Sequence, residues 1–473
     1  MSDADKISVE KGPSGTDTPV SSGVMQELHA AENDFEVFKR SDDLVDFRTV
    51  SWIRASLIYM KTIFALGVLS IPLACAQIGA APAAILVVAF GGLATYHAIV
   101  LGNFRNNHPR CHSMADMAGV VGGPILREFV GGMFVIFWVL GTGIGISGST
   151  VAFNALSNHA TCTVWWGFIA AVVVIALGSV RKYQHISWVT TLGFASVFTG
   201  VFIVVIGVTT TDRPAAAPQE GPFELGYYAV APSVSFSTGM SATLTIFAST
   251  GGSSAFLPVI SEMKRPKDYP KAVYLCMAIV NAAYLAFSLV VYRWCGTWVA
   301  SPSLGSAGET LKKVSFGVAL AGLLITPGLS LHGAAKYLFV RIMRNSPHFQ
   351  TNTVTHWAVW LSCTIGLGIV SFIIYEAVPI FNYLLTLTSA ICCAPLAIVF
   401  PVVFWMYDHK SWRTGGDGQN VLKMAWYYTM IVIGIVGMYI CVAGTYVVVV
   451  QINDAYRDGT ITGAFTCADN SSS

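Results

Sequence analysis

Four basic side chains lie inside long apolar stretches of this 473-residue chain: Lys61, His97, His332 and Lys336. An ammonium or imidazole group buried in lipid is costly and usually has a partner or a function. Lys61 lies about one helical turn before Ala65, so we expect it either to have a structural or coupling role or to snorkel to the membrane surface. His332 is expected to be either a packing residue or a proton relay.

The acidic side chains argue against an enzyme. Those near the apolar stretches all fall at edges or in loops: Asp116, Glu128, Glu262 and Glu376. A membrane hydrolase or redox enzyme would need titratable groups that converge at one depth. The histidines form no HExxH motif and the cysteines no CxxC pair, so we expect no metal site and no cofactor.

One motif is better explained by helix packing than by nucleotide binding. The residues Gly143-Ile-Gly145-Ile-Ser-Gly148 match the spacing of a dinucleotide fingerprint, but they lie in an apolar stretch with no strand before them. Small residues in membrane helices let neighbouring helices approach closely, and we expect that role here. No nucleic-acid partner is expected.

Two apolar segments are interrupted in the same way. The first reads Lys61-Thr-Ile-Phe-Ala-Leu-Gly-Val-Leu-Ser-Ile-Pro72, and the second reads Phe247-Ala-Ser-Thr-Gly-Gly-Ser-Ser-Ala-Phe-Leu-Pro258. Each combines small residues that tolerate an unwound backbone with a proline that has no backbone N–H. In lipid, unwinding is tolerated where the freed groups line a cavity or bind a ligand. A pair of such interruptions indicates a substrate site, and the alternative is two packing kinks.

The interruptions suit a zwitterion. A helix that stops inside the membrane presents carbonyl groups, and the half-helix that follows presents free amides. We expect the first interruption to hold a carboxylate and the carbonyls of the second to hold an ammonium group. The predicted substrate-binding residues are Ala65, Leu66, Gly67, Val68, Phe247, Ala248, Ser249, Thr250, Gly251 and Ser253.

The elements that position these residues are membrane-spanning helices. Of the residues, 54% are hydrophobic and 11% charged, whereas a soluble domain has about 25% charged residues. We predict an all-α membrane protein, because stretches of about 20 apolar residues are long enough to span a bilayer. The eleven predicted helices lie near residues 55–78, 82–104, 128–153, 163–180, 187–210, 239–261, 271–293, 314–340, 356–375, 379–406 and 424–450.

The basic residues predict the orientation. If the N-terminus is cytoplasmic, only five basic residues fall on the outer side: Arg213, Arg293, Lys312, Lys313 and Arg457. Lys and Arg gather on the cytoplasmic side of membrane proteins, so this orientation is favoured. It gives a disordered cytoplasmic tail (1–48), a transmembrane domain (49–453) and a short extracellular tail (454–473). No cleavable signal precedes the first span, which is expected to act as its own targeting signal.

Three cysteines are predicted to face the outer side, where a disulfide is chemically permitted: Cys162, Cys295 and Cys467. The sequence does not choose a pair among them. Asn470-Ser-Ser, close to the end of the chain, fits the glycosylation pattern.

The interrupted segments also carry a resemblance. Lys61-x3-Ala65-x-Gly67-x4-Pro72 resembles the first-helix signature of the amino acid/auxin permease family, in which a glycine stands in place of Ala65. Phe247-Ala-Ser-Thr-Gly-Gly, followed by Pro258-x3-Glu262-Met263-Lys-x-Pro266, is similar to the sixth helix of that family and its cytoplasmic exit. The resemblance covers about residues 45–467 and is greatest to the fungal neutral amino acid permeases.

The resemblance implies a five-plus-five inverted repeat with discontinuous helices one and six, and an added eleventh helix. It implies that the amides of Leu66 and Gly67 bind the substrate carboxylate and that the break from Ala248 to Gly252 binds the amine. The third span around Thr142 to Ser147 would complete the pocket together with the eighth span.

The resemblance also suggests where coupling takes place. A cation position between helices one and eight would involve Thr326, Ser330 and the carbonyls near Ile63. In a proton-coupled carrier, Lys61 or His332 would take the place of that ion. We expect H+ rather than Na+ as the coupling ion.

The expected function is therefore symport of neutral aliphatic or aromatic L-amino acids across the plasma membrane by a protein embedded in the lipid bilayer. Two alternatives stay open. One is a carrier of the vacuolar membrane, and the other is an amino acid sensor that binds without transporting.

Overall fold

The computed structural model describes residues 50–64, 67–109, 111, 113–180, 183–260, 263–343, 346, 348, 353–414, 421–459, 461 and 463–470. The predicted tail 1–48 and the predicted site residues Ala65 and Leu66 lie outside the described residues. The described chain is helical, and its one isolated β-bridge joins Val50 to Met263.

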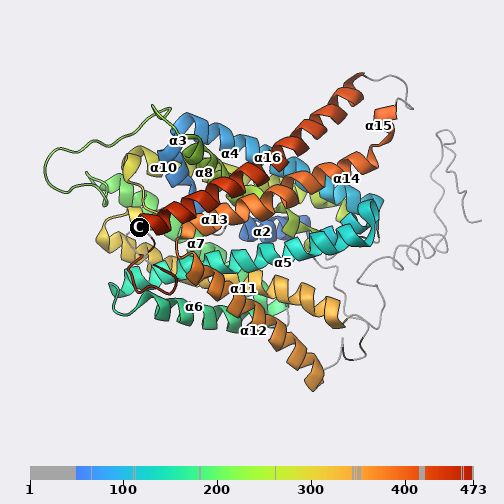
Figure 1. The fold of residues 1–473 in the computed structure, drawn as a ribbon, viewed down its shortest axis with the longest axis horizontal. Helices are drawn as coiled ribbons and strands as arrows, with labels where there is room; N and C mark the ends of the chain where they lie inside the picture. Colours follow the sequence, from blue (N-terminus) through green and yellow to red (C-terminus); the bar gives the residue numbers. More distant parts are fainter. Residues whose placement is uncertain are drawn as a thin grey trace, which may run out of the picture. The chain divides into compact units, whose positions relative to one another are not determined.

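The α-helices are named in chain order (Figure 1). They are α2 (Trp52–Ile63), α3 (Ile71–Ile78), α4 (Ala80–Asn107), α5 (Met114–Ser157), α6 (Thr163–Gly178), α7 (Tyr183–Thr210), α8 (Phe236–Thr250), α9 (Leu257–Ile260), α10 (Tyr269–Cys295), α11 (Glu309–Met343), α12 (Val354–Ala377), α13 (Phe381–Thr388), α14 (Phe400–Asp408), α15 (Ser411–Thr414) and α16 (Val421–Arg457). The shorter 3-10 segments are η1 (Gly67–Leu69), η2 (Gly251–Phe256), η3 (Pro266–Asp268), η4 (Gly296–Trp298) and η5 (Ser303–Ser306). Two π-helical segments, η6 (Ser389–Cys393) and η7 (Pro395–Val399), connect α13 to α14.

Within the described chain, eight helical segments are long and apolar enough to cross a membrane, and the pair α2 and α3, bent by 46°, makes a ninth if it counts as one span. The predicted class, an all-α membrane protein, is therefore confirmed. Two of the eleven predicted spans are not among these segments, because their helices are short: α6 has 16 residues and α8 has 15.

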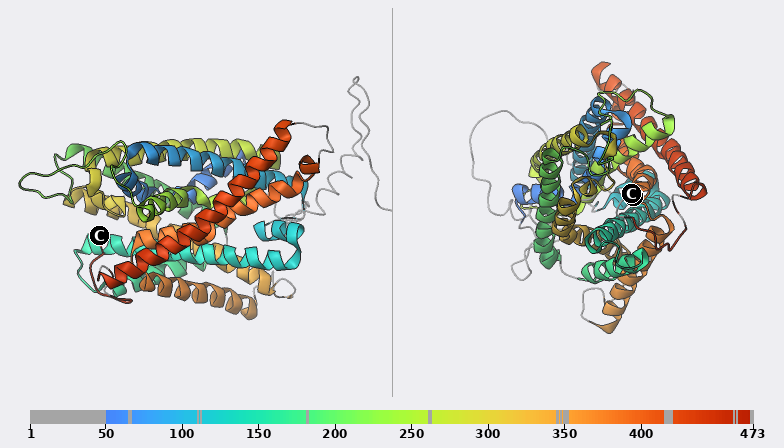
Figure 2. Two further views of the ribbon diagram at one scale, coloured as in Figure 1. Left: turned by 45° about the horizontal axis from the view of Figure 1, so that its top comes forward. Right: turned by 90° about the vertical axis from the view of Figure 1, so that its left-hand side faces the viewer.

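Small residues let the helices pack closely, as predicted for the stretch from Gly143 to Gly148. A Cβ atom added to Gly143 would lie 3.2 Å from the carbonyl oxygen of Ser371 in α12, and one added to Gly145 would collide with the ring of Pro327. α11 runs as one helix through Pro327 and packs against α5, α6 and α7. α16 packs against α13, α14 and the π-helical segments, and it crosses them obliquely in Figure 2.

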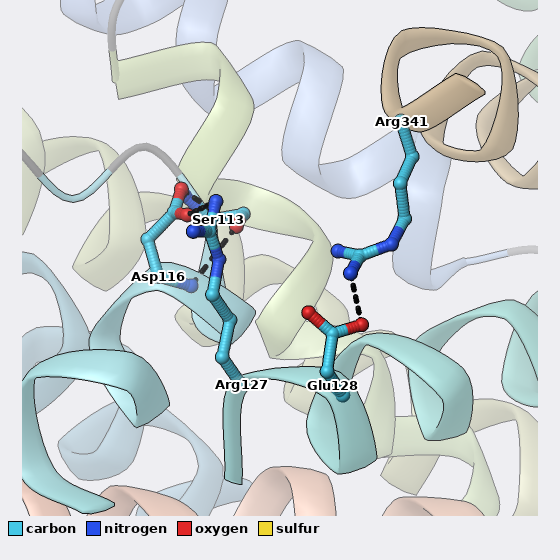
Figure 3. Close-up of polar contacts among 5 residues, drawn as sticks. All are labelled: Ser113, Asp116, Arg127, Glu128 and Arg341. Carbon is cyan, nitrogen blue, oxygen red and sulfur yellow. Dashed lines mark hydrogen bonds and ion pairs between the residues drawn. The ribbon is translucent and has the colours of Figure 1, made fainter. Parts of the chain in front are cut away.

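α5 bends near its start. Ser113 caps the helix: its Oγ accepts the backbone N–H of Asp116 at 3.2 Å, and its own backbone N–H donates to the Asp116 carboxylate at 3.2 Å. The bend follows at Gly123, whose φ of +73° is a conformation that favours glycine. Arg127, beyond the bend, reaches back to Asp116 at 2.9 Å (Figure 3). The ion pair therefore joins the two sides of the bend.

Polar contacts join helices at this end of the bundle. Glu128 of α5 pairs with Arg341 of α11, and the two side chains face each other in Figure 3. Asp408 at the end of α14 accepts from Asn107 at 2.9 Å and lies 2.8 Å from Nε2 of His108. α4 is thus joined to α14, and α5 to α11.

The opposite end of the bundle is tied by a disulfide between Cys162, before α6, and Cys467, after α16. Asn154 Nδ2 in α5 also donates to Asn470 Oδ1 at 2.8 Å. Of the three cysteines predicted to share one side, Cys162 and Cys467 are paired, and Cys295 is a buried free thiol. The sequence after α16 is therefore fastened over the junction of α5 and α6.

Candidate substrate site

The two interrupted segments meet in the structure. α2 ends at Ile63, and α8 gives way to the 3-10 segment η2 after Thr250. Gly67, in η1, lies directly against the backbone of Ser249: an added Cβ would be 2.5 Å from the Ser249 Cα atom. Real Cβ contacts are not that short, so only glycine fits between the two breaks.

Tyr284 of α10 bridges the ends of the two broken helices. Its side chain is fully buried, and its hydroxyl lies 3.0 Å from the carbonyl oxygen of Ile63 and 3.1 Å from that of Ser249. Carbonyls at helix ends lack donors from within the helix. A tyrosine has one hydroxyl hydrogen, so the two carbonyls share a single donor and keep free lone pairs.

A cavity of about 110 Å³ lies where the breaks meet. A buried water molecule needs about 10–15 Å³, so the cavity can hold a small organic molecule. No described residue of its lining carries a charge. The lining residues are Thr62, Ile63, Gly67, Phe137, Trp138, Gly141, Ile144, Ala248, Ser249, Gly252, Ala255, Thr326, Ser330, Leu385, Thr388 and Cys393.

The hydroxyl groups of the lining act as acceptors toward the cavity. Each of the five donates its hydrogen to a carbonyl of its own helix, at distances from 2.6 to 3.3 Å: Thr62, Ser249, Thr326, Ser330 and Thr388. A hydroxyl oxygen that has used its hydrogen in this way still offers lone pairs. Together with the carbonyls at the breaks, this lining is suited to an ammonium group.

The predicted substrate and coupling residues divide into two groups. Five of them line the cavity: Gly67, Ala248, Ser249, Thr326 and Ser330. Seven others that the structure describes are not among its lining residues: Lys61, Val68, Phe247, Thr250, Gly251, Ser253 and His332. The ring of Phe247, for example, is tilted against that of Phe90, with centroids 5.0 Å apart.

Two walls of the cavity were not predicted in full. α5 contributes Phe137, Trp138, Gly141 and Ile144, which begin more than one turn before the expected Thr142. The other wall is the end of α13 and η6, with Leu385, Thr388 and Cys393. The sequence feature that could have predicted this second wall is the pair of prolines at 395 and 401. Prolines interrupt helices, as Pro72 and Pro258 do in the two interrupted segments.

The exposure of the lining side chains differs along the bundle. Thr62, Phe137 and Trp138, toward the end at which α5 begins, are partly exposed. Ile144 and Leu385, on the other side of the cavity, are buried, and so is every residue of α5 from 142 to 152. The lining is therefore more exposed toward the end of the bundle at which α5 begins.

Lys61 and His332 lie in different surroundings. The Lys61 ammonium donates to the hydroxyl of Thr191 in α7, and Lys61 and Thr326 line a small void of about 10 Å³ between α2, α7 and α11. His332 is buried, with Nδ1 3.3 Å from the carbonyl oxygen of Gly178 and its ring 5.3 Å from that of Trp360. Lys61 thus adjoins the cavity through Thr326, whereas His332 packs with α6 and α12.

A helical membrane protein whose broken helices meet at a central, uncharged cavity has the architecture of a secondary transporter. The chain belongs to the family described as transmembrane amino acid transporter proteins, whose sequence model matches residues 48–447. It is 49% identical over 436 residues to a protein of Gibberella moniliformis named transmembrane transporter, covering 92% of this chain and 91% of that one. It is 27% identical over 426 residues to the N amino acid transport system protein of Neurospora crassa, covering 89% of each chain.

Solved structures share the fold at low sequence identity. A nucleobase-cation-symport-1 family transporter, in a closed conformation with bromovinylhydantoin bound, matches with a TM-score of 0.54 at 14% identity, over 90% of this chain and 95% of that one. A Na+-coupled sialic acid symporter in a substrate-bound, outward-open state matches with a TM-score of 0.52 at 13% identity, over 90% and 96% of the two chains. Identities this low relate the folds alone.

Proposed function

We propose that this protein is a symporter that imports neutral aliphatic or aromatic L-amino acids by alternating access. The observation that carries the proposal is the uncharged cavity at the meeting point of the two breaks. A charged substrate side chain would be buried there without a counter-charge, which costs several kcal/mol per ion, on the order of the whole binding energy of a micromolar substrate. The name of the Neurospora crassa relative supports an amino acid as the cargo.

The substrate would be bound as a zwitterion. The amides from Ala65 to Val68, with Leu66 and Gly67 foremost, would take its carboxylate at the start of the half-helix that leads into α3. The carbonyls and hydroxyls from Ala248 to Gly252, with Thr326 and Ser330, would take its ammonium group. The side chain would then point toward the apolar walls of α5 and α13.

Protons are the proposed coupling ion, and Lys61 is the proposed coupling residue. The resemblance puts a sodium position between the first and eighth helices, where Lys61 and Thr326 line one small void. Two unit charges 4 Å apart repel by about 4 kcal/mol at an effective dielectric constant near 20, so an ammonium at this place disfavours sodium. His332 is a weaker candidate because it packs with α6 and α12.

We further propose eleven spans in a five-plus-five inverted repeat, with α6 and the broken unit α8–η2–α9 completing the set. The N-terminal tail 1–48 would be cytoplasmic, the domain 49–453 would lie in the plasma membrane, and the tail 454–473 would be extracellular. The disulfide supports this topology because the proposed orientation puts both of the segments that it joins on the outer side, where disulfides form and persist. In this orientation the more exposed part of the lining would face the cytoplasm.

Uptake into liposomes that contain the purified protein tests the proposal. A pH gradient, acidic outside, should drive accumulation of labelled leucine or phenylalanine, with or without sodium. Accumulation that requires sodium would overturn proton coupling. Binding without any flux would overturn transport and favour the sensor, and a tagged protein located at the vacuole would favour the vacuolar carrier.

A further inference from the structure

His97 makes a contact between α4 and the π-helical region that no part of the proposed mechanism uses. Its side chain is fully buried, and its Nδ1 lies 2.7 Å from the carbonyl oxygen of Ala397 in η7. The two residues are 300 positions apart in the chain. The bond therefore fixes α4 to the segment that connects α13 and α14.

The carbonyl that His97 contacts is followed four residues later by a proline. η7 is π-helical, with the N–H of Phe400 bonded to the carbonyl oxygen of Pro395, and the α-helical pattern returns in α14. In that α-helical pattern the carbonyl of Ala397 would accept the backbone N–H four residues later, but that residue is Pro401, which has none. A buried carbonyl left without a donor costs about 1–3 kcal/mol. His97 supplies a hydrogen from another helix at the place where Pro401 removes one.

The contact also determines how the imidazole acts. A carbonyl oxygen only accepts, so the hydrogen of the ring must be on Nδ1. Nε2 is buried and has no hydrogen-bond partner among the described residues. A second hydrogen there would have no acceptor, so the ring acts as a neutral donor rather than as a charged group.

The bonded segment leads directly to the cavity. Cys393, in η6, lines the cavity and lies about one helical turn before Ala397. Gly251 packs against it from the second break, so closely that an added Cβ would be 2.8 Å from the Cys393 Cβ. A shift of the π-helical segment would therefore move the cavity wall against the break in α8.

We infer that His97 is a positioning residue for the substrate site: its Nδ1 hydrogen replaces the donor that Pro401 lacks and holds the η6 wall at its distance from the second break. The inference rests on the proposed function, because it assigns the cavity to the substrate. It requires a donor at the Nδ1 position and no titration.

Substitutions of His97 that change the position of its hydrogen-bond donor without adding a charge test the inference. The amide nitrogen of His97→Asn can replace Nδ1, whereas that of His97→Gln corresponds to Nε2. We expect His97→Asn to keep the KM for uptake within about twofold of the wild type, and His97→Ala and His97→Gln to raise it about tenfold, with smaller effects on the maximal rate.

The decisive variant is His97→Ala combined with Pro401→Ala, because alanine at 401 restores a backbone N–H for Ala397. We expect this pair to recover most of the lost affinity. The matched control pairs His97→Ala with Pro395→Ala, which restores an N–H in an earlier turn, away from the Ala397 carbonyl, and should recover nothing. Equal defects in His97→Asn and His97→Ala, or no recovery with Pro401→Ala, would overturn the inference.

Hydrogen exchange of the peptides covering 389–402 reads the same bond without transport. Exchange should be faster in His97→Ala and return toward the wild-type rate when Pro401→Ala is added. An unchanged rate in His97→Ala would overturn the inference even if the wild type proved not to transport. Failure of the proposed function would show instead as absent uptake by the wild type with this exchange pattern intact.

Discussion

Gly67 lies so close to Ser249 that an added Cβ would be 2.5 Å from the Ser249 Cα atom, which makes the contact between the two breaks intolerant of any side chain. Gly67→Ala should therefore reduce uptake strongly, and Gly67→Val should abolish it. Both act by pushing η1 away from the end of α8, in addition to crowding the proposed carboxylate position. Uptake per folded protein, measured on detergent-stable fractions, checks this.

A glycine with open space around it provides the control for Gly67. A Cβ atom at Gly92 in α4 would meet nothing within 4 Å, so Gly92→Ala should transport normally. Normal uptake by Gly67→Val would show that the contact between the two breaks is not part of the substrate site.

Tyr284→Phe should weaken the site by removing the hydroxyl shared by the carbonyls of Ile63 and Ser249. Leaving a buried carbonyl without a donor costs about 1–3 kcal/mol, so we expect a lower melting temperature and at least a fivefold higher KM. Tyr292→Phe is the control, because the Tyr292 hydroxyl contacts the backbone of Tyr228 instead. Equal effects of the two substitutions on KM would contradict a special role for Tyr284.

Lys61→Gln should uncouple transport from protons. The variant keeps a polar group beside Thr191 but has no charge to gain or lose, so we expect exchange of amino acids across the liposome membrane to continue while accumulation driven by a pH gradient is lost. Lys313→Gln, at an exposed pair with Glu309, should keep both activities. Gradient-driven accumulation by Lys61→Gln at the wild-type level would rule out Lys61 as the coupling residue.

Loss of the disulfide should lower stability and leave the substrate affinity unchanged, since Cys162 and Cys467 belong to the segments fastened over the junction of α5 and α6. A native disulfide typically contributes about 2–5 kcal/mol. Cys162→Ser, Cys467→Ser and the double variant should melt at the same lowered temperature, because each lacks the same bond. Additive losses from the two single variants would show that the thiols act separately.

Much of the helical layout could be predicted from the sequence, because apolar length and proline position are local properties. The predicted stretch 82–104, for example, lies within α4, and both interruptions coincide with helix ends. Contacts across the bundle could not be predicted. Nothing in the local sequence of Cys162 selects Cys467 over Cys295. Glu376, assigned to an edge, is 2% exposed because α6 packs against it at Gly167.

The residues of the cavity walls also divide into those that local sequence could predict and those that it could not. Ser249 and Gly67 were predicted because each lies in an interrupted segment. Cys393 and Trp138 were not, since their positions depend on how α13 and α5 pack around the breaks. The prolines at 395 and 401 mark the third irregular segment, but its importance becomes visible only through the contact between His97 and Ala397.

The central claim is that the meeting point of the two breaks recognises a neutral zwitterion. Competition against uptake of labelled leucine in proteoliposomes tests it most directly. Unlabelled neutral amino acids should compete, whereas lysine, glutamate and the leucine analogues that lack either the carboxylate or the amine should not compete at tenfold higher concentration. Equal competition by an analogue lacking one of the two charges would contradict the claim.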